Sequence, residues 1–395
     1  MTPRMPWPPD DGGRIVMWQS LPPIARRYAT TLVTLAPNAD MATPVPAAVL
    51  ALGIQVVRVP HRPSPWALMQ GAVGRWPYTL ARFRSRRLDG VLADLARRER
   101  PRFALIHHLH LAPSIEALQG VPAVLREHNV ESVWLERYAA SLKNPASRGY
   151  ARHQARRMRD TEAERVARAD LVLAIQEEEC RELRRMAPEA RVEVLPVGVE
   201  PGRFLPRAPE QPPIVLLTGS LGWEANARGA RRFLQEGWPE VRARIPTARL
   251  RLVGKGLTAG LADAARDAGA EIVGYVDAIE PEFARASALV VPLWIGAGAR
   301  VKIVEALAAG LPVASTPRAA EGLDLVAGEH LCVSDDASGL GRAVADLLER
   351  PAYAHALATA GRRFVDAHFD LRQVEDRLLE LCGAVRRAGD PLAAR

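Results

Sequence analysis

The sequence predicts an α/β protein of two doubly wound, Rossmann-like domains, with the first strand of the first domain missing or truncated. Short apolar runs rich in β-branched residues alternate with longer amphipathic segments along the chain. This pattern is typical of parallel sheets covered by helices on both faces. With 395 residues the chain is long for one core and comfortable for two. The segment Pro196–Pro213 contains six prolines and separates two sets of strands.

The individual elements follow from these runs. In the first half we expect strands at Thr31–Ala36, Ile54–Val59, Phe103–His107, Ala123–Leu125, Leu171–Ile175 and Val192–Leu195. In the second half we expect them at Ile214–Thr218, Ala248–Val253, Glu271–Val276, Ala288–Pro292, Pro312–Ser315 and Leu331–Val333. Helical patterns between them include Leu88–Arg98, Arg148–Arg168, Arg228–Glu236 and Gly341–Glu349.

These elements place a first domain at 1–196, a linker at 197–213 and a second domain at 214–370. A C-terminal helix in 371–395 could cross back to the first domain. A doubly wound domain normally begins with a central strand, whereas this sequence opens on PWPPDDGGRI, which has the character of the loop after it. We therefore expect a start upstream of Met1. The alternatives are that Met1–Met5 supplies a stub of that strand, or that the sheet is rebuilt without it.

Composition excludes several classes of protein. A hydrophobic content of 48% with 25% charged residues is globular. The three cysteines lie far apart without CxxC spacing, which argues against a disulfide framework or a zinc site. The longest apolar stretches, such as Ser287–Gly298, are shorter than the roughly 20 residues of a membrane span. The N-terminal residues include no apolar signal region. We expect a cytoplasmic protein.

The positive charge is unevenly distributed. The net charge of +8 arises in residues 1–200, concentrated in Arg82–Arg102 and Lys143–Arg168, whereas the rest of the chain is balanced. A basic face attracts anionic membrane or a phosphorylated substrate; a solvated arginine-rich surface is the equally weighted alternative. Nucleic acid is disfavoured, because the arginines lack interleaved aromatics and no reader motif is present.

The most informative stretch is VVPLWIGAGARVKIVEALAAGLPVASTPRAAEGL, residues 290–323. A buried strand is followed by a glycine loop containing Gly296 and Gly298, and then by a helix expected from about Ala299 to Ala309. Such a junction binds anions through free backbone N–H groups and the helix dipole. Arg300 and Lys302 are expected in the first turn, where cations oppose the dipole unless an anion lies between them. The alternative is that both point into solvent.

Glu305 borders the apolar face of this helix, and a carboxylate near a core needs hydrogen-bond donors. A ribose diol could supply them, as in dinucleotide-binding folds. Alternatively, Glu305 pairs with Arg300 or another basic side chain.

The segment GAGARVKIVEALAAGLPVASTPRAAEGL resembles the donor-binding motif of family 4 glycosyltransferases with the GT-B fold, closest to the subgroup written GxGxRxKxxEAxAxGxPVVxTxxxxEG. The resemblance extends over most of the chain through PPDDGGRI, REHNVES, NPASRGYARHQARRMRDTEAE, TGSLGWEANARGARRF and LRLVGKG. Proteins with segments similar to REHNVES act in exopolysaccharide assembly. The resemblance implies two Rossmann-like domains facing a central cleft, and a sugar transfer from a nucleotide-sugar donor.

The resemblance also implies roles for individual residues. Arg300 and Lys302 would hold the donor diphosphate beside Gly298, and Glu305 the ribose. Further donor contacts would come from the loops after strands, at Gly12, Gly13, Gly219, Ser220, Gly254 and Lys255. His128 would lie beside the transferred sugar; without the resemblance, a core or strand-end histidine is the better interpretation.

The sequence departs from the family pattern at three places. The acidic partner eight residues before Glu305 is Ala297, the Thr before the motif arginine is Ala299, and the Arg and Lys of many relatives are replaced around Leu221–Asn226. The subgroup also lacks the acidic residue eight positions before the motif glutamate. Arg300 and Lys302 are therefore expected to carry more of the phosphate binding.

The resemblance implies a retaining transfer in which charge on the departing diphosphate is stabilised electrostatically. No metal or other cofactor is expected, because no DxD pair is present. His107, His108 and His110 could suggest a metal, but no carboxylate stands at ligand spacing, and a loop after a strand is the expected structure.

The expected partners are a nucleotide-sugar donor and a saccharide or lipid-linked acceptor, reached by peripheral contact with the anionic inner membrane surface. Two rival functions stand: a non-catalytic relative that binds a nucleotide sugar or scaffolds a complex, and a nucleotide-sugar epimerase, which is disfavoured by the lack of a convincing carboxylate pair.

Overall fold

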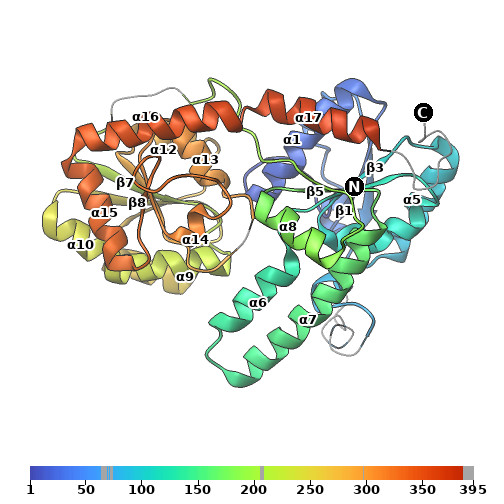
Figure 1. Cartoon of the computed structure of the whole chain (residues 1–395), viewed down its shortest axis with the longest axis horizontal. Coiled ribbons are helices and arrows are strands. Elements are labelled where there is room, and N and C mark those ends of the chain that lie inside the picture. The colour runs from blue at the N-terminus through green and yellow to red at the C-terminus, as the bar shows by residue number, and fades with distance from the viewer. Residues whose placement is uncertain (64–68, 70, 72–73, 205–208, 297, 386–395) are drawn as a thin grey trace. The chain divides into compact units, whose positions relative to one another are not determined.

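The computed structural model of the chain describes residues 1–63, 69, 71, 74–204, 209–296 and 298–385. It divides into two compact units (Figure 1). Unit 1 comprises Met1–Val197, Ala297–Ala299 and Gln373–Arg395, and unit 2 comprises Gly198–Gly296 and Arg300–Arg372. Each is described by itself.

Unit 2 is built on a six-stranded, fully parallel sheet of order β12-β11-β10-β7-β8-β9. Its strands are β7 Ile214–Thr218, β8 Arg249–Val253, β9 Glu271–Gly274, β10 Ala288–Val291, β11 Val313–Ser315 and β12 Cys332–Val333. The central strand β7 is buried along its whole length. Its side chains alternate between two hydrophobic clusters, Val215 and Leu217 in one and Ile214 and Leu216 in the other. The sheet therefore has a core on each face.

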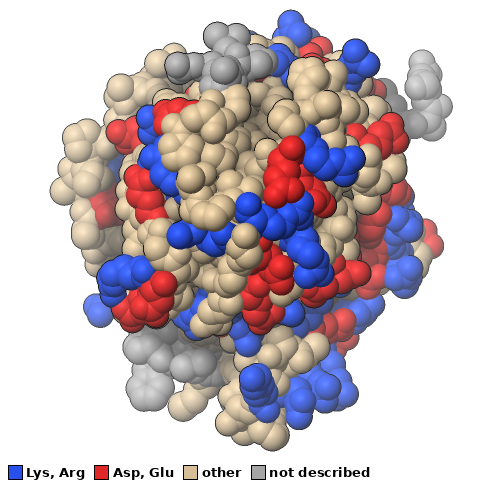
Figure 2. Space-filling model, turned by 90° about the vertical axis from the view of Figure 1, so that its left-hand side faces the viewer, with Lys and Arg blue, Asp and Glu red and all other residues tan. Residues whose placement is uncertain are grey.

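Helices cover both faces of this sheet (Figure 1). They are α9 Glu224–Arg232, the π-helical η3 Phe233–Gly237, α10 Trp238–Arg244, α11 Ala259–Asp267, α12 Glu280–Arg285, α13 Val301–Ala308, α14 Pro317–Ala320, α15 Ala337–Glu349 and α16 Pro351–His368. On the side shown in Figure 2, basic and acidic side chains are interspersed. Ion pairs such as Arg244–Asp346 and Arg232–Glu236 agree with the balanced charge of the second half.

Unit 1 has two parallel sheets, β1-β2 and β3-β4-β5-β6. The strands are β1 Thr31–Ala36, β2 Gln55–Pro60, β3 Ala104–His107, β4 Ala123–Arg126, β5 Leu171–Ala174 and β6 Val192–Val194. The helices are α1 Gly12–Arg27, η1 Asn38–Met41, α2 Ala47–Leu50, α4 Tyr78–Ala81, α5 Arg86–Glu99, η2 Leu109–Leu118, α6 Glu131–Ser141, α7 Pro145–Arg168, α8 Glu177–Met186 and α17 Leu371–Ala384. Leu378 and Leu381 of α17 pack with Val124 and Leu173 of the sheet.

The first two residues lie between the two sheets of unit 1. Thr2 forms a parallel bridge with Thr34 of β1. On the other side, the His107 N–H donates to the Met1 carbonyl at 3.0 Å, and the Met1 amino group donates to the Leu105 carbonyl. Met1 and Thr2 thus lie at the centre of the unit 1 strands, and we call this two-residue segment the stub.

A cavity of about 560 Å³ continues from this stub. It is lined by both strand edges and the helices over them, including Leu32 and Val33 of β1, Ala104 and Leu105 of β3, Met17 and Leu21 of α1, and Leu92 and Ala96 of α5. Two extended residues span only about 7 Å, against about 20 Å for the six residues of β1. The stub therefore leaves most of the central strand position unfilled.

The α/β fold class with parallel sheets in two Rossmann-like units is confirmed, and all twelve expected strands are present with end differences of one or two residues. The expected helices Arg148–Arg168 and Leu88–Arg98 lie within α7 and α5. Among the described helices, none combines the length and apolarity of a membrane span.

Candidate functional site

In unit 2, the candidate site lies where the strand order reverses. Strands added after β7 run outward on one side through β8 and β9, and on the other through β10, β11 and β12. Ligands of doubly wound sheets bind at this switch point, beyond the carboxyl ends of the strands. The loop after β7 carries Gly219 and Ser220, and the loop after β10 leads to Arg300 and α13.

Gly219 and Gly254 lie where two loops approach each other through their backbones. Gly219 has a φ of +139° and Gly254 a φ of +147°. A Cβ added to Gly254 would lie 1.8 Å from the Gly219 carbonyl oxygen. The Gly219 N–H donates to the Val253 carbonyl at 3.1 Å, and the Leu221 N–H to the Lys255 carbonyl at 2.8 Å. The structure therefore brings together the predicted residues Gly219, Ser220, Gly254 and Lys255.

Lys302 extends from α13 to the end of β7. Its ammonium donates to the Thr218 carbonyl at 2.6 Å and to the Asn226 Oδ1 at 3.2 Å. The same Nζ lies 2.5 Å from the position a Cβ on Gly219 would occupy. Burial, and to a smaller extent the charge of Arg300, lowers the pKa of Lys302 to about 8. Because both hydrogen-bond acceptors are neutral, the charge of Lys302 is not compensated by them.

Arg300 stands before α13 and not in its first turn, so the expected helix start near Ala299 is wrong. The helix begins at Val301, and Arg300 has a left-handed φ of +45°. Gly296 and Gly298 also have positive φ, so the backbone of this loop becomes helical only after Arg300. The guanidinium donates to the carbonyls of Arg318 at 2.9 Å and Gly296 at 3.3 Å. Gly298 is described, whereas Ala297 lies outside the described residues.

Glu305 is buried, with 8% of its surface exposed, and faces Arg203. The Arg203 guanidinium donates to Glu305 at 2.8 Å and to Glu280 at 2.7 Å. Burial raises the pKa of Glu305, and the charge of Arg203 opposes this rise. The structure thus shows the pairing of Glu305 with a basic side chain, and its partner Arg203 comes from the expected linker.

Sequence reasoning missed Arg203 and Asn226. Asn226 receives a hydrogen bond from Lys302 and donates to the Ser220 carbonyl at 2.9 Å, so it links α9, α13 and the loop after β7. The only sequence signal was its place among the residues that replace the family's Arg and Lys. Arg203 could not be found from local pattern, because it lies 102 residues from Glu305.

In unit 1, the glycine loop lies at the start of α1. Asp11 caps this helix by accepting from the Arg14 N–H at 3.0 Å, and Gly12 and Gly13 are its first residues. A Cβ on Gly13 would lie 3.3 Å from the Arg4 guanidinium and 3.6 Å from the His108 Nε2. Gly13 therefore allows α1 to begin close to the histidines that follow β3.

His128 follows β4 and belongs to a cluster of histidines. Its ring stacks on His108 with centroids 3.6 Å apart, and its Nε2 lies 3.2 Å from the His107 Nδ1. Burial, followed by the neighbouring histidines and Arg126, lowers the pKa of His128 well below its usual value. The cluster is therefore neutral at pH 7 and offers hydrogen-bonding nitrogens without charge.

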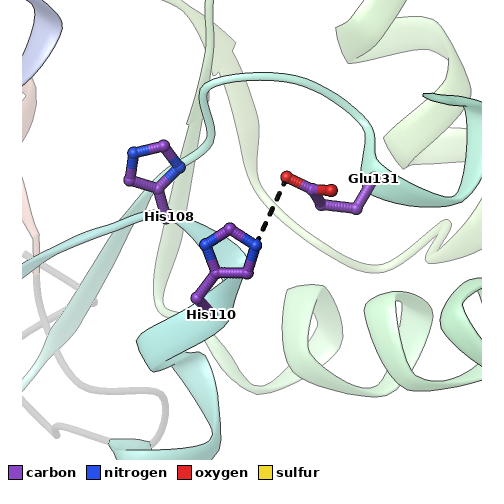
Figure 3. A group of neighbouring side chains, drawn as sticks. All are labelled: His108, His110 and Glu131. Carbon is purple, nitrogen blue, oxygen red and sulfur yellow. Dashed lines mark ion pairs between the residues drawn. The ribbon is translucent and has the colours of Figure 1, made fainter. Parts of the chain in front are cut away.

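The expectation that no carboxylate accompanies His107, His108 and His110 is wrong, because Glu131 lies beside His110. Glu131 opens α6 and lies with its Oε1 3.7 Å from the His110 Nε2, as the dashed line in Figure 3 marks. The residues are 21 positions apart, and the parallel pairing of β3 with β4 aligns the loops that carry them.

Each unit thus assembles its own group of predicted residues. Unit 2 gathers Gly219, Ser220, Gly254, Lys255, Arg300, Lys302 and Glu305, and unit 1 gathers Gly12, Gly13 and His128. Chemically, the first group presents the cations Arg300 and Lys302 beside glycine-rich backbone, an arrangement that receives anions. The second presents neutral imidazoles.

Two family models match the sequence. One described as "Glycosyltransferase Family 4" matches residues 72–203, and one described as "Glycosyl transferases group 1" matches residues 212–350. No curated protein sequence matches.

Solved structures resemble the chain over nearly its whole length. Sucrose-phosphate synthase from Thermosynechococcus elongatus is 17% identical with a TM-score of 0.72, each chain covering 96% of the other. Anabaena HepE in complex with UDP and glucose is 14% identical with a TM-score of 0.68, covering 97% of this chain and 98% of its own. WaaG, a glycosyltransferase involved in lipopolysaccharide biosynthesis, is 16% identical with a TM-score of 0.66, covering 95% and 97%. At these identities the structures show a common fold.

Proposed function

Because the chain belongs to the family 4-like glycosyltransferases with the GT-B fold, we propose that it is a retaining, metal-independent enzyme that moves a sugar from a nucleoside diphosphate to a saccharide or lipid-linked acceptor. The single observation that carries the proposal is the cation pair of unit 2. Arg300 and Lys302 lie close together at the switch point: the charge of Arg300 lowers the pKa of Lys302, and the Lys302 ammonium donates to the neutral oxygens of Thr218 and Asn226.

A diphosphate would compensate the charge of Lys302, whose two hydrogen-bond acceptors are neutral. Holding the half-buried Lys302 with a pKa near 8 costs folding free energy, and an anion at this point recovers part of it. Gly296, which has a positive φ, carries no side chain that would cover the backbone amides before Arg300. Both features favour a bound pyrophosphate over a neutral ligand.

The same cations would act in the reaction. Glycosyl transfer breaks the bond between the anomeric carbon and the diphosphate oxygen, so negative charge grows on that oxygen in the transition state. Arg300 and Lys302 are already fixed by hydrogen bonds and need little reorganisation to stabilise that charge. In a retaining transfer the departing phosphate takes the proton of the acceptor hydroxyl. Neither a covalent intermediate nor a metal enters these steps.

In unit 1, we assign His128 to the hydroxyl groups of the transferred sugar. Its Nδ1 is buried without a hydrogen-bond partner among the described residues, and its neutral state suits an uncharged sugar. Gly13 lets the start of α1 come close to His108, the ring on which His128 stacks. Glu305 would accept from the ribose while it remains paired with Arg203.

The related structures suggest the donor and acceptor classes. HepE is crystallised with UDP-glucose, and TarM with UDP and a glycosylated glycerol, so a UDP-sugar is the first donor to test. WaaG is involved in lipopolysaccharide biosynthesis, which supports a lipid-linked saccharide acceptor and a place in polysaccharide assembly for this chain. Such an acceptor would bring the basic unit 1 to an anionic membrane surface, a contact that salt and neutral vesicles should abolish.

Calorimetric titration with UDP tests the proposal directly. Each charge-assisted hydrogen bond contributes about 1.5–3 kcal/mol, so the double variant Arg300→Ala/Lys302→Ala should lose at least about 100-fold in affinity. Arg266→Ala, which removes an exposed arginine of unit 2 on α11, is the matched control and should bind as the parent does. Undetectable UDP, GDP and dTDP binding by the folded parent, or undiminished binding by the double variant, would overturn the proposal.

Turnover with UDP-, GDP- and dTDP-sugars then separates transfer from epimerisation and from binding alone. The anomeric configuration of the product, followed by NMR, distinguishes retention from inversion. Unchanged rates in excess EDTA are expected for a metal-independent transfer.

A further inference from the structure

A second group of ligand-type side chains lies in unit 1, outside the family motif of unit 2. His108 follows β3, His110 lies in η2, and Glu131 is the first residue of α6. One ligand atom from each of the three lies within 4.8 Å of the others. Figure 3 shows both imidazole rings with the Glu131 carboxylate directed at the His110 ring.

The spacing of His110 and Glu131 suits a shared ion better than a hydrogen bond. The His110 Nε2 and the Glu131 Oε1 are 3.7 Å apart, beyond hydrogen-bonding distance. This Nε2 is buried and has no hydrogen-bond partner among the described residues. Two ligands at about 2.0–2.1 Å from a tetrahedral ion lie roughly 3.3 Å apart. A small movement of either side chain therefore brings both atoms onto one ion.

The surrounding residues hold the three side chains in place. The Asn129 amide donates to the Glu131 Oε1 at 2.8 Å, and the Glu131 backbone N–H is bound by the buried Glu162 at 2.7 Å. On the other side, the His110 ring stacks between Phe83 and His108, with centroid distances of 4.7 and 5.3 Å. Such outer contacts orient ligands in metal sites and favour binding by limiting the entropy lost.

We propose that His108, His110 and Glu131 bind a divalent transition-metal ion of the zinc type, with a fourth position left open to water. Two imidazole nitrogens and one carboxylate oxygen are the donor set of several three-ligand zinc sites. Nitrogen donors select Zn²⁺ and its neighbours over Mg²⁺ and Ca²⁺, which prefer oxygen. His108 supplies the remaining ligand atom by turning toward the other two, from within the 4.8 Å that now separates them.

The site is separate from the proposed diphosphate contacts of unit 2, so its binding is measured without donor. One consequence rests on the proposed function: His108 also stacks on His128 at 3.6 Å. An ion that turns His108 toward His110 would weaken this stacking, so Zn²⁺ would inhibit a transfer that itself needs no metal.

Isothermal titration of the full chain with ZnCl₂, after treatment with EDTA, tests the proposal. We expect one ion per chain and a rise in melting temperature, with no response to MgCl₂. The variants His110→Ala and Glu131→Gln should each bind at least about 100-fold more weakly, since even an outer-shell loss typically costs about 10–100-fold. Asn129→Ala removes only an outer contact and should weaken Zn²⁺ binding by about 10–100-fold.

Two variants control for general effects of substitution. His355→Ala removes an exposed histidine of α16, and Glu136→Gln neutralises an exposed glutamate on the same helix as Glu131. Both should bind Zn²⁺ as the parent does. Glu131→Gln keeps the shape of the side chain, so its fold can be verified by near-ultraviolet circular dichroism. The proposal is overturned if the parent shows no saturable 1:1 binding, or if folded Glu131→Gln and His110→Ala bind as tightly as the parent. Either failure would leave the UDP titration of unit 2 unaffected.

Discussion

The two units have the same kind of fold but differ at the centre of their sheets. In unit 2, β7 lies between β8 and β10, and its backbone is hydrogen bonded on both sides. In unit 1, the corresponding position between β1 and β3 holds only Met1 and Thr2 and a cavity of about 560 Å³. The loop after a fully paired strand is fixed from both neighbours, whereas the loop after the stub depends on two residues. We infer that the loop after β7 in unit 2 is more rigid than the loop after the stub in unit 1.

The two units also differ in the charge of the side chains that follow their strands. Unit 2 keeps the Lys302 ammonium on neutral oxygens, close enough to Arg300 for its charge to lower the Lys302 pKa, and two neighbouring cations suit a diphosphate. In unit 1, burial keeps His107, His108 and His128 neutral, which suits hydroxyl groups. Doubly wound sheets of one design thus carry charged groups in one unit and neutral groups in the other, because the loops after the strands, and not the strands, carry the chemistry.

The largest effect is expected where the backbone packing of unit 2 is tightest. Gly254→Ala would place a Cβ 1.8 Å from the Gly219 carbonyl oxygen at a residue with φ +147°. The loops after β7 and β8 must separate, so we expect a loss of more than about 4 kcal/mol in the free energy of unfolding and loss of UDP binding. Gly274→Ala is the control: its φ is +81°, but the Cβ would meet nothing within 4 Å, so only the backbone strain of about 1–2 kcal/mol applies. Equal denaturation midpoints for the two variants would contradict the packing argument.

The next prediction concerns the incomplete centre of unit 1. In a chain that starts at Met1, burial lowers the pKa of the amino group from 8.0 to about 5. Because this pKa is lower in the folded state, the unfolded state binds the extra proton between pH 8 and pH 5, and stability falls as the pH is lowered through that window. Three pKa units correspond to at most about 4 kcal/mol.

An engineered extension tests this difference between the units. Five β-branched apolar residues placed before Met1 would replace the amine by a peptide group and fill the cavity between β1 and β3. We expect a higher melting temperature and a weaker dependence of stability on pH between 5 and 8. Five Gly and Ser residues serve as the control, since they remove the amine without filling the cavity. A Gly and Ser extension that stabilises as much as the apolar one would show that the cavity contributes nothing.

A smaller effect is expected at the carboxylate of α13. Arg203→Met would leave Glu305 buried beside Glu280 without its guanidinium partner. Because Arg203 is about one-third exposed, solvent screens the pair, and we expect a loss of about 1–2 kcal/mol in unfolding free energy. The loss should grow with pH as Glu305 ionises. The double variant Arg203→Met/Glu305→Gln should recover most of it; a double variant as unstable as the single one would show that Arg203 acts through packing on Phe204 instead.

The outcome for the sequence predictions follows the same division between strands and loops. All twelve strands were predictable because buried parallel strands are short apolar runs with a strong local pattern. The left-handed conformation of Arg300 was not predictable, because a non-glycine residue adopts a positive φ only when the rest of its loop requires it. Neither Arg203 beside Glu305 nor Glu131 beside His110 has a local signal, since the topology of the sheet brings these partners together.

The smallest predicted effect concerns the protonation of Lys302 and tests the electrostatic side of the comparison. In the free protein its pKa is about 8, and a bound diphosphate would raise it. UDP affinity should therefore be greatest below pH 8 and fall by up to about tenfold per pH unit above it, because binding must then take up a proton. The phosphate itself is fully ionised in this range, since its second pKa is near 6.

The variant Lys302→Arg keeps its charge at every pH used, so the decrease between pH 7 and pH 9 should disappear even if its affinity is lower throughout. Titrations at pH 8.5 in buffers with different ionisation enthalpies would count the proton taken up directly. Parallel titrations in which parent and Lys302→Arg lose affinity equally would show that some other group titrates. In that case the ammonium of Lys302 would not be the cation that meets the diphosphate, and unit 2 would depend on Arg300 and the backbone amides of its loop.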